Sequence, residues 1–178
     1  MKLSVFNLEN SKEVIELFTT VFTESEGEAE GKLIGSFVSD LITTTDKCDL
    51  VGFIARSGEN IVGSIFFSRL VLSNDKTAFI LSPVAIATKD QGKGLGQQLI
   101  NFGIEHLKSL NVDLVLTYGD PNFYSKVGFK QVSEAVVKAP LKLSHPEGWL
   151  AQSLNDVPIE AMKGSSQCVK ALNDQRYW

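Results

Sequence analysis

The sequence is poor in the residues that build metal centres and disulfide frameworks. It contains two cysteines and two histidines, and Cys48 and Cys168 lie far apart with no pair of histidines near either. Because a zinc site needs several clustered ligands, we predict that the protein holds no metal. Two separated cysteines are typical of reduced thiols in a cytosolic protein rather than of a disulfide scaffold.

Long runs of one charge and long apolar runs are also missing. The net charge is −4, with 17 Lys and Arg against 21 Asp and Glu, so the basic footprint of a nucleic-acid-binding protein is absent. No stretch approaches the length of a membrane span, and charged Glu9, Lys12 and Glu13 stand where a signal peptide would be apolar. We therefore predict a cytoplasmic protein that binds neither nucleic acid nor membranes.

The composition is that of a globular protein of ordinary size. Hydrophobic residues make up 43% and charged residues 21% of the 178 residues, which is enough to bury a substantial core. No repeat, low-complexity segment or linker interrupts the chain. We predict a single domain over residues 1–178, with a core of about 1–138 and a C-terminal extension, 139–178, packed on it.

The apolar periodicity of the first third predicts a strand followed by two helices. Alternating apolar residues over 3–7 indicate a short strand, after which Asn10 or Ser11 can cap an amphipathic helix. A second amphipathic helix is expected over 33–42. The acidic segment 23–31 between the two helices is expected to be a loop.

Strands predominate in the middle of the chain. Strand patterns separated by tight turns cover 50–56, 61–72 and 77–86, which predicts an antiparallel meander. A helix over 94–110 and a buried strand over 112–117 then indicate a right-handed parallel crossover. The predicted fold class is therefore α/β, with a twisted mixed sheet and helices on both faces.

The periodicity weakens toward the C-terminus. Asp120 and Pro121 can open a short helix, because Asp caps and Pro is tolerated at the first helical position. Gly128 is expected to end that helix, and residues 129–137 are expected to form a strand. Past Pro140 the pattern does not assign elements.

A glycine loop between the strand over 77–86 and the following helix carries the strongest functional signal. Gly92, Gly94 and Gly96 let the main chain approach a pyrophosphate, while the helix N-terminus supplies N–H donors and a positive dipole end. Lys93 offers charge to a phosphate or remains a solvated surface lysine. The P-loop pattern fails because no Ser or Thr follows the Lys, and the dinucleotide pattern fails because Gln97 replaces a glycine.

Three stretches together resemble the GNAT superfamily of N-acetyltransferases. The loop 91–96, Gln-Gly-Lys-Gly-Leu-Gly, resembles the family's acyl-CoA signature, Gln/Arg-x-x-Gly-x-Gly/Ala. The upstream strand 81–86 is similar to the family's central strand, and 124–129 is similar to its Tyr-x-x-x-Gly-Phe element. The resemblance covers about 50–132 and implies the GNAT-like acyl-CoA N-acyltransferase fold.

The resemblance implies a site for acetyl-CoA with two parts. Pro83 cannot donate to a sheet ladder, so the strand is expected to bulge or to part from its neighbour there. In the family this gap admits the pantetheine arm, and a main-chain N–H nearby polarises the thioester carbonyl. The implied contacts are Val84, Ala85 and Ile86 for pantetheine, and Gln91, Gly92, Lys93, Gly94, Leu95, Gly96 and Gln97 around the pyrophosphate.

Tyr124 is the catalytic residue that the resemblance implies. Its O–H would protonate the departing thiolate of CoA; the alternative is a buried tyrosine that is hydrogen-bonded to the backbone and has no catalytic role. The family often has an Asn at the end of the preceding strand, where this chain has Thr117-Tyr118-Gly119-Asp120, which puts a contact from Asn122 in doubt. The implied activity is acetyl transfer to a primary amine by direct attack in a ternary complex. The alternative is a non-catalytic acyl-CoA-binding or regulatory module.

The acceptor and the general base stay open at this point. An ammonium acceptor must lose a proton before it attacks, so a carboxylate or a relayed water is expected. Tyr118 is a further candidate, whereas His106 and His145 have no visible partner in the sequence. The acceptor is expected to be a small-molecule or peptide amine, and a homodimer is possible because dimers are common in the family. The carboxylates in the acceptor-side segment are Glu24, Glu26, Glu28 and Glu30.

Overall fold

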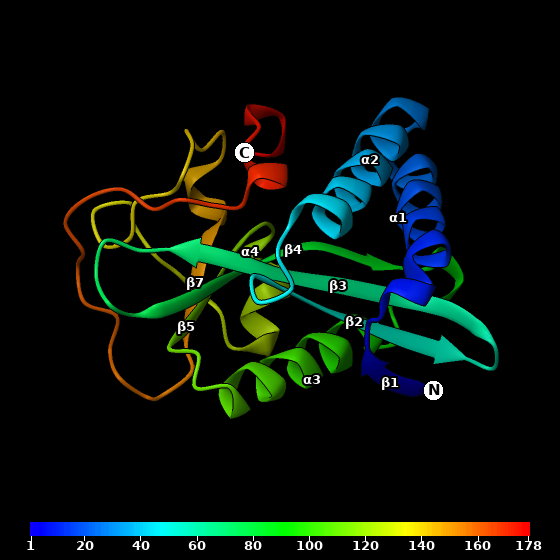
Figure 1. Ribbon diagram of the computed structural model, residues 1–178, viewed down its shortest axis with the longest axis horizontal. Helices are drawn as coiled ribbons and strands as arrows, with labels where there is room; N and C mark the ends of the chain where they lie inside the picture. The colour runs from blue at the N-terminus through cyan, green and yellow to red at the C-terminus, as the bar shows by residue number, and fades with distance from the viewer. The chain divides into compact units, whose positions relative to one another are not determined.

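A seven-stranded mixed sheet with the strand order β1-β2-β3-β4-β5-β7-β6 is the framework of the protein (Figure 1). The computed structural model describes the whole chain, Met1–Trp178. The predicted α/β class with helices flanking a mixed sheet is confirmed. The strands are β1 (Lys2–Val5), β2 (Leu50–Ser57), β3 (Asn60–Val71), β4 (Thr77–Ile86), β5 (Leu114–Tyr118), β6 (Lys130–Gln131) and β7 (Trp149–Ser153). The helices are α1 (Ser11–Glu26), α2 (Glu28–Thr44), α3 (Leu95–Ser109) and α4 (Pro121–Tyr124).

The residues pack into two compact units. The first consists of Met1–Phe67 with Pro83–Gly103, and the second of Ser68–Ser82 with Ile104–Trp178. Strands β3 and β4 are each divided between the two units, β3 after Phe67 and β4 before Pro83. That the chain is one domain stays a prediction. No helix is long and apolar enough to cross a lipid bilayer, and no three His, Cys, Asp or Glu side chains gather as metal ligands would.

In the first unit the sheet is covered on both faces, which explains why β3 is buried along most of its length. Successive residues of a strand point to opposite faces, and Phe66 packs on Phe18 of α1 with ring centroids 6.1 Å apart. Phe67 points the other way, where a Cβ added to Gly103 of α3 would lie 2.6 Å from its ring. Gly103 therefore lets α3 approach the sheet closely.

Helices α1 and α2 pack at close range, and their junction corrects one prediction. The expected loop over 23–31 is wrong, because α1 continues to Glu26 and α2 begins at Glu28. Gly27, with φ +103°, is the only residue between them. Glutamate is a good helix former, and Gly31 serves close packing: a Cβ there would lie 1.9 Å from the hydroxyl of Thr23.

The second unit is built around β5. Strand β4 pairs with β5 in parallel from Ala78↔Leu114 to Leu81↔Thr117, so the predicted parallel crossover is confirmed. Strand β7 pairs antiparallel with β5 and β6, and it comes from the C-terminal part that the sequence pattern did not assign. The predicted strand over 129–137 is mostly wrong. Only Lys130–Gln131 is extended, because Ser133 then closes a turn, its carbonyl accepting from the N–H of Val136 at 2.9 Å.

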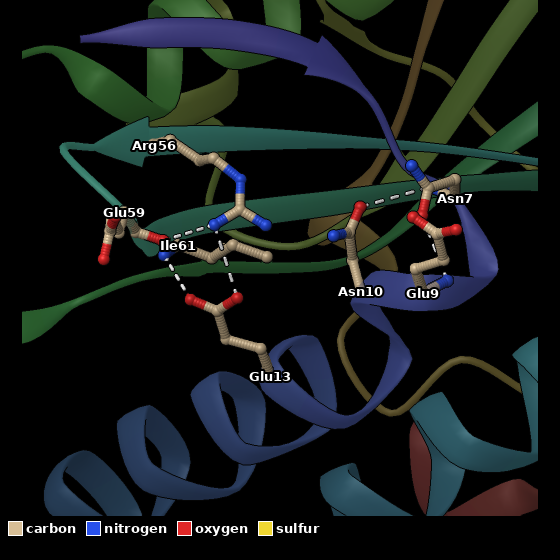
Figure 2. A network of polar contacts seen from close by, with 7 residues as sticks. All are labelled: Asn7, Glu9, Asn10, Glu13, Arg56, Glu59 and Ile61. Atoms are coloured by element: carbon tan, nitrogen blue, oxygen red, sulfur yellow. Dashed lines mark hydrogen bonds and ion pairs between the residues drawn. The ribbon is translucent and has the colours of Figure 1, made fainter.

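A polar network ties the start of α1 to the β2–β3 hairpin (Figure 2). Glu13 of α1 accepts a hydrogen bond from the N–H of Ile61 at 2.6 Å and lies 3.4 Å from the guanidinium of Arg56. Arg56 also donates to the carbonyl of Glu59 in the hairpin. Before α1 the chain forms a 3-10 turn, Leu8–Asn10, with a capping box in which the side chains of Asn7 and Asn10 accept from backbone N–H groups. Asn10 makes no side-chain capping bond to α1 itself.

We predict that Glu13→Ala lowers the free energy of unfolding by about 1 kcal/mol, because the N–H of buried Ile61 loses its acceptor. Glu16→Ala is the matched control on the same helix. Glu16 pairs only with Lys12, at 3.9 Å, and both side chains are largely exposed, so its loss should cost less than about 0.5 kcal/mol. Urea unfolding of both variants measures the difference, and equal costs would contradict the role given to the Glu13 network.

Candidate functional site

The connection from β4 to α3, in the first unit, is a short and well-tied loop. After Ile86, the N–H of Ala87 donates to the carbonyl of Val62 at 2.8 Å. The Gln91 side chain turns back and donates from Nε2 to the carbonyl of Ile86 at 2.9 Å. Both bonds fix the loop to the end of β4. Gln91, predicted as part of the site, therefore has a structural role at the start of the loop.

Two glycines give the loop its shape. Gly92 has φ +72° and Gly94 has φ +78°, a backbone region that costs other L-residues strain. A Cβ at either position would meet nothing within 4 Å. Their glycine identity is therefore required by backbone conformation, and the space above the loop is open. The carbonyl of Gly94 accepts from the N–H of Gln98 at 3.0 Å and so begins α3.

The first turn of α3 follows directly and contributes N–H donors. In any α-helix the first N–H groups lack partners within the helix and carry the positive end of the dipole. Here they belong to Leu95, Gly96 and Gln97, all three predicted for the site. Leu95 and Gly96 are buried and Gln97 is half-buried, so the turn is anchored in the protein while residues 91–94 are exposed.

Lys93 lies within the loop rather than extending away from it. Its ammonium donates to the carbonyl of Lys89 at 2.7 Å and lies 3.2 Å from Oδ1 of Asp90. The Asp90 side chain is only 15% exposed, and its Oδ2 is buried without a hydrogen-bond partner. Lys93 therefore compensates the negative charge of Asp90, which would otherwise disfavour an anion at the loop.

Strand β4, which precedes the loop, contains the three residues that were predicted to contact pantetheine through their main chain. Ala85 and Ile86 are buried and Val84 is half-buried. The ladder pairs of β4 with β5 end at Leu81, two residues before Pro83. Because proline has no N–H to give to a ladder, Pro83 is a physical reason for pairing to stop in this stretch.

Tyr124 is held in the second unit by the geometry of its short helix. Asp120 caps α4, accepting from the N–H of Asn122 at 2.9 Å, and Pro121 follows at the first helical position, as predicted. The Tyr124 ring packs edge-on against Phe129 with centroids 5.7 Å apart. A Cβ on Gly119 would lie 2.6 Å from the same ring. Gly119 therefore makes room for Tyr124.

Burial is the main reason that the pKa of Tyr124 is raised above 10.0; the hydroxyl of Thr117 opposes this rise, and the negative charge of Asp120 adds to it. Tyr124 is therefore a neutral phenol with a proton to give at physiological pH. Thr117 itself donates from Oγ1 to the carbonyl of Leu81 at 2.9 Å.

The other candidates for acid–base chemistry have structural partners. The hydroxyl of Tyr118 accepts from the N–H of His145 at 2.7 Å, and its ring stacks on Trp178 with centroids 6.0 Å apart. The His145 imidazole lies 3.3 Å from Glu147, and His106 lies half-buried near the end of α3. These contacts explain the presence of Tyr118 and His145 without catalysis.

Of the four glutamates, Glu24 is the one with a contact to the loop segment. Its carboxylate accepts a hydrogen bond from the hydroxyl of Thr88, whereas Glu28 pairs with Lys32 on its own helix at 2.6 Å. Glu24 and Thr88 lie at an open hollow of about 630 Å³ in the first unit. The hollow is lined by Leu17, Thr20, Val21, Glu24, Ala87, Thr88 and Lys89.

Sequence reasoning gave no role to Thr88, whose hydroxyl donates to Glu24. A threonine in a turn is ordinary, so this residue carries no signal of its own. The hollow could have been anticipated in part, because Leu17, Val21 and Glu24 share one face of a helix at i, i+4 and i+7. The residues that pack beside that face could not be predicted from the periodicity.

Comparisons with known proteins agree on one family. A family model described as an acetyltransferase (GNAT) domain matches residues 49–131. The uncharacterized N-acetyltransferase YjhQ of Escherichia coli K12 is 28% identical over 137 residues, covering 74% of this chain and 75% of that protein. The uncharacterized N-acetyltransferase YhbS of the same strain is 30% identical over 107 residues, covering 59% of this chain and 60% of that one.

Solved structures show the same fold over nearly the whole chain. The GNAT family N-acetyltransferase YhbS from Escherichia coli, solved in complex with CoA, matches with a TM-score of 0.83 and 24% identity, covering 98% of this chain and 92% of that one. A GNAT family acetyltransferase from Brucella melitensis, in complex with acetyl-CoA, matches with a TM-score of 0.73 and 19% identity, covering 97% and 99%.

Proposed function

We propose that this chain is an N-acetyltransferase of the GNAT superfamily, and that it transfers an acetyl group from acetyl-CoA to a primary amine. The observation that carries the proposal is the loop after β4, where left-handed Gly92 and Gly94 lead into the N-terminus of α3 beneath open space. Such a loop suits the pyrophosphate of the acyl donor. The chemistry is direct attack of the amine on the thioester, which needs no covalent enzyme intermediate.

The donor is bound through two stretches of main chain. The N–H groups of the loop and of the first turn of α3 bind the pyrophosphate, and Lys93 adds its charge there while it holds Asp90. The main chain of Val84, Ala85 and Ile86 pairs with the pantetheine arm. The end of the β4–β5 ladder at Leu81 and the missing N–H of Pro83 support this placement, because they leave backbone groups of β4 available.

In the reaction, the amine nitrogen forms a bond to the carbonyl carbon and the C–S bond breaks. A main-chain N–H of the 84–86 stretch stabilises the oxyanion that forms in between. Tyr124 gives its phenolic proton to the departing thiolate, and it recovers a proton from solvent afterwards. The proton that the acceptor loses goes to Glu24 or to a water beside it. The products are the N-acetylated amine and CoA.

The hollow beside Glu24 is the place proposed for the acceptor. Its lining combines apolar side chains of α1, such as Leu17 and Val21, with one carboxylate. Glu24 can hold an ammonium group, and the apolar wall suits an aliphatic or aromatic body better than a polycation. We therefore expect small amines with an apolar body to be better acceptors than aminoglycosides or lysine-rich peptides.

Replacing Tyr124 by Phe should lower kcat on the order of 100-fold, because the thiolate then leaves without a proton donor. The KM for acetyl-CoA should be unchanged. The assay follows the release of the CoA thiol with a panel of monoamines, aminoglycosides and peptides. Unaltered turnover would remove Tyr124 from the mechanism. Binding of CoA by the wild-type protein without thiol release from any amine would instead favour a non-catalytic acyl-CoA-binding module.

Replacing Gly94 by Ala should weaken the binding of CoA at least about tenfold, because an alanine is strained in the left-handed conformation that the loop requires. Gly58→Ala is the matched control. Gly58 has φ +62° and an equally open Cβ position, but it lies in the β2–β3 hairpin, so the strain is similar and the site is untouched. Isothermal titration calorimetry gives both Kd values. An equal loss of affinity in the two variants would contradict the loop's role.

A further inference from the structure

The hollow beside Glu24 is lined by two charged residues of opposite sign that do not pair with each other. Glu24 comes from the last turn of α1, and Lys89 comes from the segment that follows β4. Both residues are exposed. The Lys89 ammonium makes no hydrogen bond or ion pair with Glu24 or with any other group. The hollow therefore has a cation on its wall that no group of the protein neutralises.

The carboxylates near Lys89 are engaged elsewhere. Glu24 accepts a hydrogen bond from the hydroxyl of Thr88, which orients its carboxylate at the hollow. Asp90, the residue after Lys89, lies 3.2 Å from the ammonium of Lys93. A lysine ammonium without a counter-ion at a hollow is a binding group for an anion, and a carboxylate there is a binding group for a cation. One ligand can therefore satisfy both.

The two charged groups lie close to each other along the chain as well. Thr88, which holds Glu24, is directly followed by Lys89. A ligand that pairs with both Glu24 and Lys89 must therefore carry its positive and negative groups near each other, as an amino acid does. A plain amine would leave Lys89 unpaired, and a diamine would bring a second positive charge toward it.

The rest of the lining is suited to an apolar side chain. Leu17 and Ala87 are half-buried, and Val21 is buried. The hollow measures about 630 Å³, which is within the range of pockets that bind small molecules. The space therefore accepts an apolar group of the size of an aromatic ring next to the two charges.

We infer that the acceptor carries a carboxylate beside its amine and an apolar side chain, and that Lys89 selects it by pairing with that carboxylate. This inference rests on the proposed function, because it names the class of acceptor for that reaction. Glu24 binds the ammonium end of the acceptor, and the wall formed by Leu17, Val21 and Ala87 contacts its side chain. The carboxylate takes no part in the bond changes, so Lys89 determines specificity and is not a catalytic residue.

The test compares phenylalanine with phenethylamine, the same molecule without its carboxylate, in the wild type and in Lys89→Met. Methionine keeps an aliphatic stem and removes the charge. For phenylalanine, kcat/KM should fall about fivefold through KM, the size expected of an ion pair at an open site, whereas kcat/KM for phenethylamine should not fall. Comparing each acceptor between the two proteins removes the difference in amine basicity. No fall for phenylalanine, or an equal fall for both acceptors, would overturn the inference.

Two control variants and salt show that the charge of Lys89 is responsible. Lys89→Arg keeps the charge and should retain the kcat/KM for phenylalanine. Lys12→Met removes a positive charge from the other end of α1, where Lys12 pairs with Glu16 at 3.9 Å, and should change neither acceptor. Added salt should narrow the difference between wild type and Lys89→Met, because it screens the ion pair. A difference that ignores salt, or that Lys12→Met reproduces, would contradict the role of Lys89.

The KM for acetyl-CoA separates this role from a contact of Lys89 with a phosphate of the donor. It should be the same in the wild type and in Lys89→Met. A raised KM for acetyl-CoA, together with equal losses for phenylalanine and phenethylamine, would assign Lys89 to the donor and overturn the inference.

A binding measurement separates failure of this inference from failure of the proposed function. If other amines release the CoA thiol and phenylalanine does not, the inference alone fails. If no amine releases it, the proposed function fails, and calorimetry of the CoA-bound protein with phenylalanine still tests Lys89. Phenylalanine should bind the wild type about fivefold more tightly than it binds Lys89→Met. Equal affinities, or no binding to the wild type, would overturn the inference.

Discussion

The left-handed backbone at Gly92 and Gly94 is the constraint on which the candidate donor site depends. It turns the chain from the end of β4 into the first turn of α3 and leaves the outer side of the loop open. Around this turn, Gln91 ties the loop to Ile86, and Lys93 compensates Asp90. The protein thereby fixes a set of N–H donors in advance, so that little ordering is left to the ligand.

Local sequence patterns were enough to predict those parts of the fold that depend on residues close together in the sequence. The strands around residues 50–86 and the helix after Gly94 follow from periods of two and 3.6 residues. The start of α4 follows from capping chemistry at Asp120. The glycine loop was predicted because glycine is the residue type that tolerates a positive φ and a close approach of the main chain to a ligand.

The rest could not be predicted because it depends on partners far away in the sequence. Strand β7 is stabilised by pairing with β5, and its own residues carry no strong pattern. Residues 23–31 look like a loop until Gly31 is placed against Thr23 of the neighbouring helix. Thr117 is an ordinary strand residue until its hydroxyl is placed against the carbonyl of Leu81 on the neighbouring strand. Glu24 stands out from its neighbours only through its contact with Thr88.

The most direct test of the proposed donor site is a titration of the 15N-labelled protein with CoA, followed through its backbone amide resonances. If the loop holds the pyrophosphate and β4 holds the pantetheine arm, the amides of Gly92, Gly94 and Gly96 and those of Val84, Ala85 and Ile86 should shift together, saturating at one Kd. Shifts that leave both stretches unmoved while other residues respond, or no response at millimolar CoA, would contradict the site.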